Sequence, residues 1–393
     1  MSILYNKKHI SAIALYALPL NNIVMRIGID CRLFSQNFTG IGRYTHELVD
    51  HFIKLNDRDN RRHELVLFFN KPEFQEYEPR NPSIKKVLVN SRHYSFAEQF
   101  RFLFHLNRAK CDIVHFPHFN IPIFYRRPYI ATIHDLILHF FPGRKMAKFY
   151  QRIAYNLIIK NAVKHAKKII AVSENTKNDL IKHLHVSPEK IQTIYNGISN
   201  IFTMSQNQSA KPPFLLYTGV WRSHKNLPRL LKAFALIRKK ENIDLKLVIT
   251  GKEDKNYPEV KNTVKELGLS DEVIFTGLVS EKELCRLYNA ATITVCPSLY
   301  EGFGFPPLES MKCGTPVAAS RTSSLPEVCG RDNAVFFDPY DTDDMSRKIA
   351  SLYKDAALQA DLIEKGFAHA AKFTWEKSSR QTYELLTHIL KAQ

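Results

Sequence analysis

The sequence predicts an α/β protein made of two domains, each built on a parallel sheet. Three observations lead to this prediction: a length of 393 residues with 45% apolar content, short apolar strands that alternate with amphipathic helices, and a second start of that alternation near the middle of the chain. Strands that alternate with helices favour parallel sheets with right-handed crossovers. A chain of this length favours two domains over one.

The first half begins with a strand at 24–30, followed by the loop 38–44 and an amphipathic helix that continues through Leu55. Further strands are expected at 64–69, 84–89, 113–116, 129–134 and 168–172. These elements define an N-terminal Rossmann-like domain over residues 25–199.

The second half starts again with a strand, and a polar stretch with paired prolines, 200–213, is the expected linker. Strands are expected at 214–219, 245–250, 273–277 and 291–297, and helices at 227–239 and 281–290. The second domain is assigned to 214–370, and a C-terminal helix within 371–393 is expected to pack back on the first domain.

Residues 1–24 are interpreted as an extension or interfacial anchor. The apolar run Ile10–Leu20 follows two lysines and imitates a signal-peptide core, but a poor cleavage site follows it, and Met25 is an alternative start. No apolar run reaches the roughly 18 residues that span a bilayer. The six cysteines form no CxxC pair, which argues against a thiol-redox motif or a zinc site and favours reduced thiols in a cytosolic protein.

Positive charge is concentrated in the first half of the chain. Residues 1–200 carry 30 Lys+Arg against 15 Asp+Glu, whereas residues 201–393 carry 26 against 23. One predicted helix has its cations along one face and apolar residues off that face. The cations are Lys145, Lys148, Arg152, Lys160, Lys164 and Lys167, and the apolar residues are Phe149, Ile153, Leu157 and Ile158.

A basic helix of this kind predicts an anionic partner, unless it is only a solvated face. An anionic membrane leaflet, a phosphorylated lipid substrate and nucleic acid all have the required charge. Nucleic acid is disfavoured because no helix-turn-helix, zinc-finger or RNP-type pattern accompanies the cations. We therefore expect a membrane surface or a lipid-linked substrate at the first domain.

The most informative motif is Glu301–Glu309, two carboxylates around a Gly-rich turn directly after an apolar strand. Strand, turn and helix start in this order form the place where open α/β sheets bind nucleotides. Gly302 and Gly304 allow close approach to a ligand, and Glu309 falls one to two turns into the following helix. One carboxylate is expected to meet a reacting sugar and the other a ribose.

Cations follow the first strand of the second domain. Arg222 and Lys225 lie beside a Gly-rich turn and near a helix start, where positive charge is unfavourable unless an anion is bound. They would neutralise a diphosphate leaving group. On the first domain, the segment Gly40–Arg43 supplies an unhindered turn and another cation. The alternative is a pair of solvated cations and an ordinary tight turn.

His134 and Asp135 end an apolar strand and are expected at the same strand-end crevice. His134 could bond a sugar hydroxyl, and Asp135 could orient His134 or a neighbouring turn. We assign no metal, because His115 and His118 lack further ligands at a recognisable spacing. The DxD patterns at 57–59 and 341–343 are interpreted as capping or solvation features.

Six segments together resemble the retaining glycosyltransferases of family 4, which have the GT-B fold, and the resemblance covers residues 25–370. The segments are Gly40–Tyr44, Ile133–Leu136, Val172–Glu174, Asn196–Ile198, Trp221–Asn226 and Glu301–Glu309. The Glu-x7-Glu segment combined with the Lys-Asn element is the specific part. Ser323–Val328 is also similar to bacterial mannosyltransferases that build O-antigen or capsular polysaccharide.

The resemblance implies two Rossmann-like domains that face each other across a cleft, and a role for each matching residue. The catalytic set would be Glu301, His134, Lys225 and Arg222, and the donor-binding set Gly42, Arg222, Lys225, Gly277, Phe303, Gly304 and Glu309.

Within these sets, Arg222 and Lys225 would hold the diphosphate, bordered by Gly42, and Glu309 would bond the ribose. Glu301, His134 and the backbone of 303–304 would hold the sugar. One departure affects Arg222: many relatives have Arg directly before the Lys, where this chain has His224.

The resemblance further implies GDP-mannose as donor, an undecaprenyl-diphosphate-linked glycan as acceptor, no cofactor or metal, and a peripheral place on the cytoplasmic membrane face. Four alternatives remain open. They are a UDP-sugar-dependent transferase (glucosyl, galactosyl or N-acetylglucosaminyl), a sugar-nucleotide epimerase, a nicotinamide-dependent dehydrogenase and a basic nucleic-acid-binding protein. The dehydrogenase is disfavoured because the segment 40–45 lacks the last Gly of G-x-G-x-x-G.

Overall fold

The computed structural model describes residues 25–34, 40–59, 63–91, 93–143, 148–205, 212–241 and 243–391. The predicted extension 1–24 and the question of a start at Met25 therefore lie outside the described residues, as do Lys145 and part of the predicted linker.

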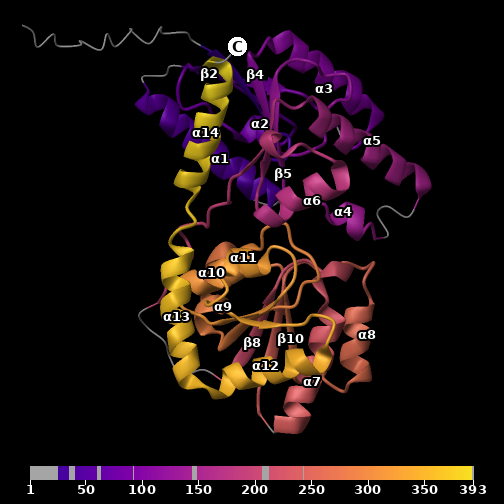
Figure 1. Ribbon diagram of the computed structural model, residues 1–393, viewed down its shortest axis with the longest axis vertical. Helices are drawn as coiled ribbons and strands as arrows, with labels where there is room; N and C mark the ends of the chain where they lie inside the picture. Colours follow the sequence, from indigo (N-terminus) through magenta and orange to yellow (C-terminus); the bar gives the residue numbers. More distant parts are fainter. Residues whose placement is uncertain are drawn as a thin grey trace, which may run out of the picture.

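The first domain contains a seven-stranded sheet in the order β3-β2-β1-β4-β5-β6-β7, and every neighbouring pair is parallel (Figure 1). The strands are β1 Met25–Asp30, β2 His63–Phe69, β3 Ile84–Leu88, β4 Ile113–Phe116, β5 Tyr129–Ile133, β6 Lys168–Ala171 and β7 Ile191–Thr193. This order reverses between β1 and β4, which is where open α/β sheets place their ligand sites.

Helices cover both faces of the first sheet. Successive residues of a strand point to opposite faces, and in this sheet both faces carry apolar side chains that need to be covered. One face packs on α1 Ile41–Arg58, and the other on α3 Phe96–Ala109, α5 Phe149–His165 and α6 Glu174–Leu184. Two four-residue helices, α2 Glu73–Glu76 and α4 Ile137–Phe140, and a 3-10 turn, η2 Pro188–Lys190, lie in the connections.

The second domain contains a six-stranded parallel sheet in the order β10-β9-β8-β11-β12-β13. Its strands are β8 Phe214–Thr218, β9 Lys246–Thr250, β10 Val273–Gly277, β11 Ile293–Cys296, β12 Val317–Ser320 and β13 Val335–Phe337. The helices are η3 Ser223–Lys225, α7 Leu227–Glu241, α8 Glu259–Glu266, α9 Glu281–Ala290, α10 Phe305–Lys312, α11 Leu325–Cys329, α12 Thr342–Lys354 and α13 Ala356–Ala370.

The last helix, α14 Trp375–Lys391, leaves the second domain and lies against α1 of the first (Figure 1). Its apolar face completes the core on that side of the first sheet, with Leu386 fully buried. Aromatic side chains form part of this contact. The ring centroids of Tyr44 and Trp375 lie 5.9 Å apart, and those of Phe52 and Tyr383 lie 5.5 Å apart.

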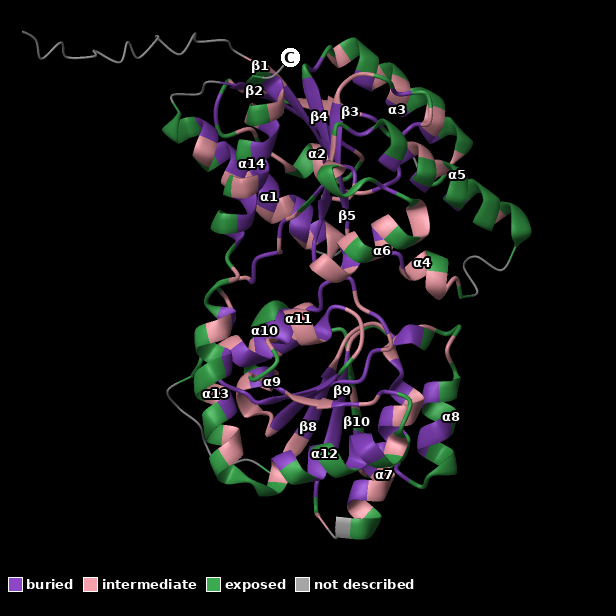
Figure 2. Ribbon diagram, viewed as in Figure 1, coloured by how far each residue is buried: buried purple, intermediate pink, exposed green. Residues whose placement is uncertain are grey.

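The predicted strands are all present, with ends that differ by at most two residues from the prediction. Two expectations were wrong in part. Helix α1 extends to Arg58, so Asp57 lies inside the helix rather than beyond the end expected at Leu55. The basic helix α5 begins at Phe149, and of the apolar residues off its basic face Phe149, Ile153 and Leu157 are exposed, whereas Ile158 packs against the core. Figure 2 shows this helix projecting, largely exposed, beyond the sheet.

Candidate active site between the two domains

The carboxyl ends of the strands of both sheets meet at the interface between the domains, and Gly302 lies at their point of closest contact. The Gly302 carbonyl accepts hydrogen bonds from Ser173 Oγ at 2.6 Å and Thr176 Oγ1 at 3.2 Å. A Cβ on Gly302 would lie 1.9 Å from the His134 carbonyl oxygen. Only glycine allows the domains to come this close.

Two further contacts join the domains. The Glu327 carboxylate, from α11, accepts hydrogen bonds from the amides of Glu174 at 2.6 Å and Asn175 at 3.0 Å, and so caps α6 of the other domain. Tyr300 donates from its hydroxyl to Asp179 Oδ2 at 2.6 Å. Anions at a helix N-terminus are stabilised by the unpaired amides and the helix dipole, so the first of these is a favourable ionic contact.

Lys225 and Glu301 form the charged centre of the interface. The short turn η3 carries Lys225, whose Nζ lies 2.5 Å from Glu301 Oε1, and Ser298 Oγ donates to the same oxygen at 2.6 Å. Burial alone would raise the pKa of Glu301, but the neighbouring Lys225 ammonium lowers it below its ordinary value. Glu301 is therefore ionised at neutral pH.

Serine side chains hold the loop that follows Glu301. The Glu301 amide donates to Ser323 Oγ at 2.7 Å, and Ser324 Oγ donates to the Phe303 carbonyl at 2.9 Å. The Phe303 ring packs in the core against Phe373, so a ligand in the interface can meet Phe303 only through its backbone. Gly304 has φ of 97°, a conformation that favours glycine, and begins α10.

Glu309 lies one turn into α10, as predicted, and is 2% exposed. Its two oxygens have separate partners: Oε1 lies 2.5 Å from Arg43 NH1, and Oε2 accepts from the Tyr288 hydroxyl at 2.9 Å. Arg43 also pairs with Glu281 at 2.8 Å. A ribose could bond Glu309 only by taking over one of these contacts. The sequence indicated Arg43 as a cation at this interface but not its pairing with Glu309.

His134 lies at the end of β5 as predicted. Its Nε2 lies 2.8 Å from the Pro117 carbonyl oxygen, which can only accept, so Nε2 carries the proton and Nδ1 keeps a lone pair. Burial lowers the pKa of His134 to about 4. The ring is therefore neutral at pH 7 and can accept one hydrogen bond through Nδ1.

Asp135 holds the turn that leads into the short helix α4, because its Oδ1 accepts from the Ile137 amide at 2.8 Å. Burial, with a contribution from the charge of Glu301, raises the pKa of Asp135 to about 6, against the lowering effect of Lys225. Of the two roles expected for Asp135, orienting a neighbouring turn is the one that the hydrogen bonds support.

Arg222 does not join Lys225 at Glu301; its NH1 lies 3.4 Å from Asp254 Oδ2. His224, which stands where many relatives have Arg, is buried next to Phe141. Burial, followed by the Lys225 charge, lowers the pKa of His224 to about 4, so it adds no cation at neutral pH. Lys225 is thus the cation in direct contact with the predicted sugar-binding carboxylate.

Glycines line the strand ends of the second sheet, near the predicted Gly277. The Gly277 carbonyl accepts from the Gly251 amide at 2.9 Å, and a Cβ on Gly251 would lie 2.2 Å from the Gly219 oxygen. Sequence reasoning missed Gly251, although its place directly after a strand is the same signal that marked Gly219. Gly42 is buried in the first turn of α1, on the opposite side of the interface.

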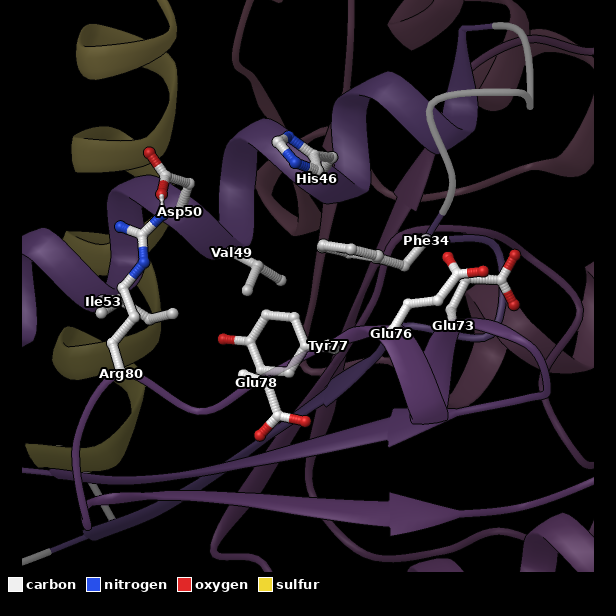
Figure 3. Close-up of a pocket in the computed structure, with 10 residues that line it drawn as sticks. All are labelled: Phe34, His46, Val49, Asp50, Ile53, Glu73, Glu76, Tyr77, Glu78 and Arg80. Carbon is white, nitrogen blue, oxygen red and sulfur yellow. Dashed lines mark ion pairs between the residues drawn. The ribbon is translucent and has the colours of Figure 1, made fainter.

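A cavity of about 480 Å³ lies elsewhere, between α1 and the segment that contains α2 (Figure 3). It is lined by none of the predicted site residues, and Figure 3 shows carboxylates around it and Tyr77 at its centre. The lining residues are Phe34, His46, Val49, Asp50, Ile53, Glu73, Glu76, Tyr77, Glu78 and Arg80. An acidic lining repels a diphosphate, so we place donor binding at the domain interface.

Within the described part of the chain, no three His, Cys, Asp or Glu side chains group as metal ligands. Of the two DxD patterns, the second is a cap: Asp341 begins α12 and accepts from the Asp344 amide at 3.0 Å. Among the described helices, none combines the length and apolar character needed to cross a bilayer.

The fold is confirmed by solved structures. Sucrose-phosphate synthase from Thermosynechococcus elongatus is 20% identical and superposes with a TM-score of 0.78, over 94% of this chain and 100% of that one. WaaG, a glycosyltransferase involved in lipopolysaccharide biosynthesis, is 14% identical with a TM-score of 0.70, over 92% and 99%. Two parallel-sheet Rossmann-like domains in this arrangement define the GT-B class of glycosyltransferases.

The family is equally clear. Residues 38–200 match the model of Glycosyltransferase Family 4, and residues 200–369 match that of Glycosyl transferases group 1. Together the two matches span residues 38–369, so the chain belongs to the family 4 glycosyltransferases, as predicted. O-antigen chain mannosyltransferase B of Escherichia coli is 29% identical over 381 residues, 88% of this chain and 96% of that protein. O-antigen chain mannosyltransferase RfbU of Salmonella typhimurium is 29% identical, over 72% and 75%.

Proposed function

We propose that the protein is a retaining mannosyltransferase. It moves mannose from GDP-mannose to a lipid-linked glycan during the synthesis of a bacterial surface polysaccharide, at the cytoplasmic face of the membrane. The observation that carries the proposal is the buried Lys225–Glu301 pair at the domain interface, with Glu309 on the same loop-helix unit. The similarity to the O-antigen mannosyltransferases above supports mannose and the polysaccharide pathway.

The chemistry we propose needs a stabilised leaving group and a positioned sugar. The acceptor hydroxyl oxygen attacks the anomeric carbon on the face from which the diphosphate departs. The bond from the anomeric carbon to the phosphate oxygen breaks with its electron pair on that oxygen, which takes the acceptor proton. Lys225 neutralises the growing negative charge, and such preorganised stabilisation is commonly the largest catalytic term. This scheme uses no metal and no dedicated general base.

The remaining residues position the donor. Glu301 accepts hydrogen bonds from sugar hydroxyls while it holds Lys225 in place, and His134 accepts a hydrogen bond from another sugar hydroxyl through Nδ1. Glu309 bonds the ribose after exchanging Arg43 or the Tyr288 hydroxyl. Gly42, Gly277 and the backbone of 303–304 allow close approach, and Arg222 contributes positive charge from beside Asp254. Closure of the domains over the donor excludes water and so limits its hydrolysis.

The first test is thermal unfolding in EDTA with GDP, UDP, NAD or short duplex DNA. A ligand at a hundred times its dissociation constant stabilises the folded state by about 2.7 kcal/mol. We expect GDP to raise the transition temperature and GDP-mannose to support transfer. Stabilisation by UDP alone would keep the enzyme class and replace the donor. Stabilisation by NAD or DNA alone would overturn the proposal, and product formation without acceptor would indicate an epimerase.

A further inference from the structure

Helix α3 presents a row of phenylalanines to solvent. Phe96, Phe100 and Phe104 are 90%, 64% and 58% exposed. Residues four apart lie on one side of a helix, so the three rings form a single stripe. The opposite side of α3 is an ordinary core face, where Phe102 and Leu106 are fully buried. The helix is therefore apolar on two sides, and the packing within the chain accounts for only one of them.

Helix α5 repeats this arrangement. Phe149, Ile153 and Leu157 follow the same four-residue step and are 77%, 43% and 63% exposed, and Tyr150 beside them is 62% exposed. The buried residues of α5 lie mostly in its C-terminal half. Its N-terminal half projects past the edge of the sheet and carries apolar side chains that have no core to enter (Figure 2).

The two stripes belong to one side of the molecule. Both helices pack on the same face of the first sheet and share one core cluster. The loop between β4 and β5 connects them: the Ile123 amide donates to Gln99 Oε1 of α3 at 2.9 Å, and the Phe119 ring lies 5.3 Å from that of Tyr155 of α5. Phe124, on this loop, is 59% exposed. Exposed apolar side chains gathered on one side of a domain in this way mark an interaction site.

The exposed charges on the two helices have one sign. Residues 136–173 contain no Asp or Glu, and Glu98, the only acid of α3, is buried against Arg32. Cations on and beside the two helices are exposed, namely Arg101, Arg108, Lys110, Lys148, Arg152, Lys160 and Lys164. A second copy of the same surface would bring like charges together, which disfavours self-association. An anionic lipid surface satisfies both the apolar and the cationic side chains.

We propose that the exposed stripes of α3 and α5 insert into the interfacial region of an anionic membrane, while the surrounding cations contact lipid phosphates. This surface deepens the proposed function, because it would hold the first domain at the membrane that carries a lipid-linked acceptor. Helices that lie in the interface plane combine aromatic and aliphatic side chains with Lys and Arg in this way. Both attractions act together, since neither cations alone nor apolar groups alone explain the surface.

The test is co-sedimentation of the full chain with vesicles of phosphatidylcholine, alone or mixed equally with phosphatidylglycerol. We expect binding to the mixed vesicles only, weakened by salt. The double variants Phe100→Ser/Phe104→Ser and Ile153→Ser/Leu157→Ser should each bind at least about tenfold more weakly. Phe367→Ser, which removes an exposed ring from α13 of the second domain, is the matched control and should bind like the unaltered protein.

Three outcomes would overturn the proposal. Equal binding to both vesicle types would exclude anionic lipid as the partner, and full binding by the stripe variants would exclude these side chains. If the unaltered protein did not bind vesicles but formed a dimer, and the stripe variants were monomeric, the surface would be a contact between two copies of the chain. Thermal stabilisation by GDP should persist in all variants that keep the unfolding transition. Its absence from the unaltered protein would contradict the donor proposal and leave this one standing.

Discussion

At the residue scale, the site depends on which charges are buried in contact with each other. Lys225 and Glu301 are 14% and 13% exposed and directly paired, and the Lys225 ammonium lowers the pKa of the Glu301 carboxyl, which burial alone would raise. His224, one residue away, is neutral because burial lowers its pKa to about 4. Lys225 is thus the cation in contact with the predicted sugar-binding carboxylate, although the sequence shows three basic residues there. This arrangement makes Lys225 the residue whose loss should matter most.

We expect Lys225→Ala to lower kcat/KM for transfer from GDP-mannose by about 100-fold to 1000-fold, the usual effect of removing one group that stabilises a developing anion. The substitution also leaves Glu301 buried without its cation, which raises the pKa of Glu301. Steady-state assays of transfer measure the effect. Lys232→Ala, an exposed lysine on α7, is the control and should keep full activity. Unchanged activity of Lys225→Ala would contradict the assignment.

Asp135 predicts a pH dependence of stability. Its carboxyl has a pKa of about 6 in the folded protein and about 3.9 when unfolded. Between these values the folded state holds a proton that the unfolded chain has released, so the contribution of Asp135 to stability falls as pH rises from about 4 to about 6. Asp135→Asn cannot ionise and keeps an acceptor for the Ile137 amide. Relative to the unaltered protein, the Asp135→Asn variant should gain about 2 to 3 kcal/mol of unfolding free energy as the pH rises from 4 to 7.

Denaturant unfolding of both proteins at pH 4 and pH 7 measures this difference. A gap between them that is the same at both pH values would show that Asp135 titrates alike in the folded and unfolded states.

At the element scale, the loop that joins β11 to α10 does most of the positioning. It carries Glu301 at its start, approaches the first domain at Gly302, turns at Gly304, and directs α10 so that Glu309 is buried one turn later. Ser323 and Ser324 hold this path from the next connection. The proposed donor binding and the domain contact therefore share a single loop, and a change in one should affect the other.

Gly302→Ala tests this coupling. The added Cβ would lie 1.9 Å from the His134 carbonyl oxygen. This oxygen belongs to the backbone of the first domain, so the clash can be relieved only if the two domains move apart. We expect at least about a tenfold loss of transfer, with less than about 2 kcal/mol lost in unfolding free energy, since the strain is relieved by opening rather than by unfolding.

Gly268→Ala is the control for Gly302→Ala. Its φ of 66° disfavours a side chain, but nothing lies within 4 Å of the added atom, so stability should fall slightly and activity should not change. Full activity of Gly302→Ala would show that the close contact is not needed for catalysis.

At the scale of the whole molecule, the sequence predicted the two sheets and the loops that meet between them, because strand periodicity and Gly-rich turns are local patterns. It did not predict the pairing of Arg43 with Glu309, which joins residues 266 positions apart, because charge alone does not select a partner. The exposed stripe of α5 was missed for a related reason. A periodic pattern shows which residues share a side of a helix, but not how far the sheet beneath it extends.

Glu327 offers a test of how the two domains are held together. Two motifs that carry the family resemblance meet here, because the carboxylate of one caps the helix of the other through the amides of Glu174 and Asn175. Hydrogen bonds to charged groups are worth about 1.5 to 3 kcal/mol each. We expect Glu327→Ala to favour the open arrangement and to speed hydrogen exchange of these two amides at least about tenfold.

Amide exchange followed by mass spectrometry or NMR measures the Glu327 effect. Asp332→Ala, an exposed acid just after α11, should leave the exchange unchanged. Saturating GDP should restore part of the protection if the donor bridges the domains, since a ligand that binds the closed form better shifts the population toward it. If the two amides exchange at the same rate in Glu327→Ala and in the unaltered protein, other contacts hold the interface closed. The Glu327 carboxylate would then contribute nothing to the stability of the closed form.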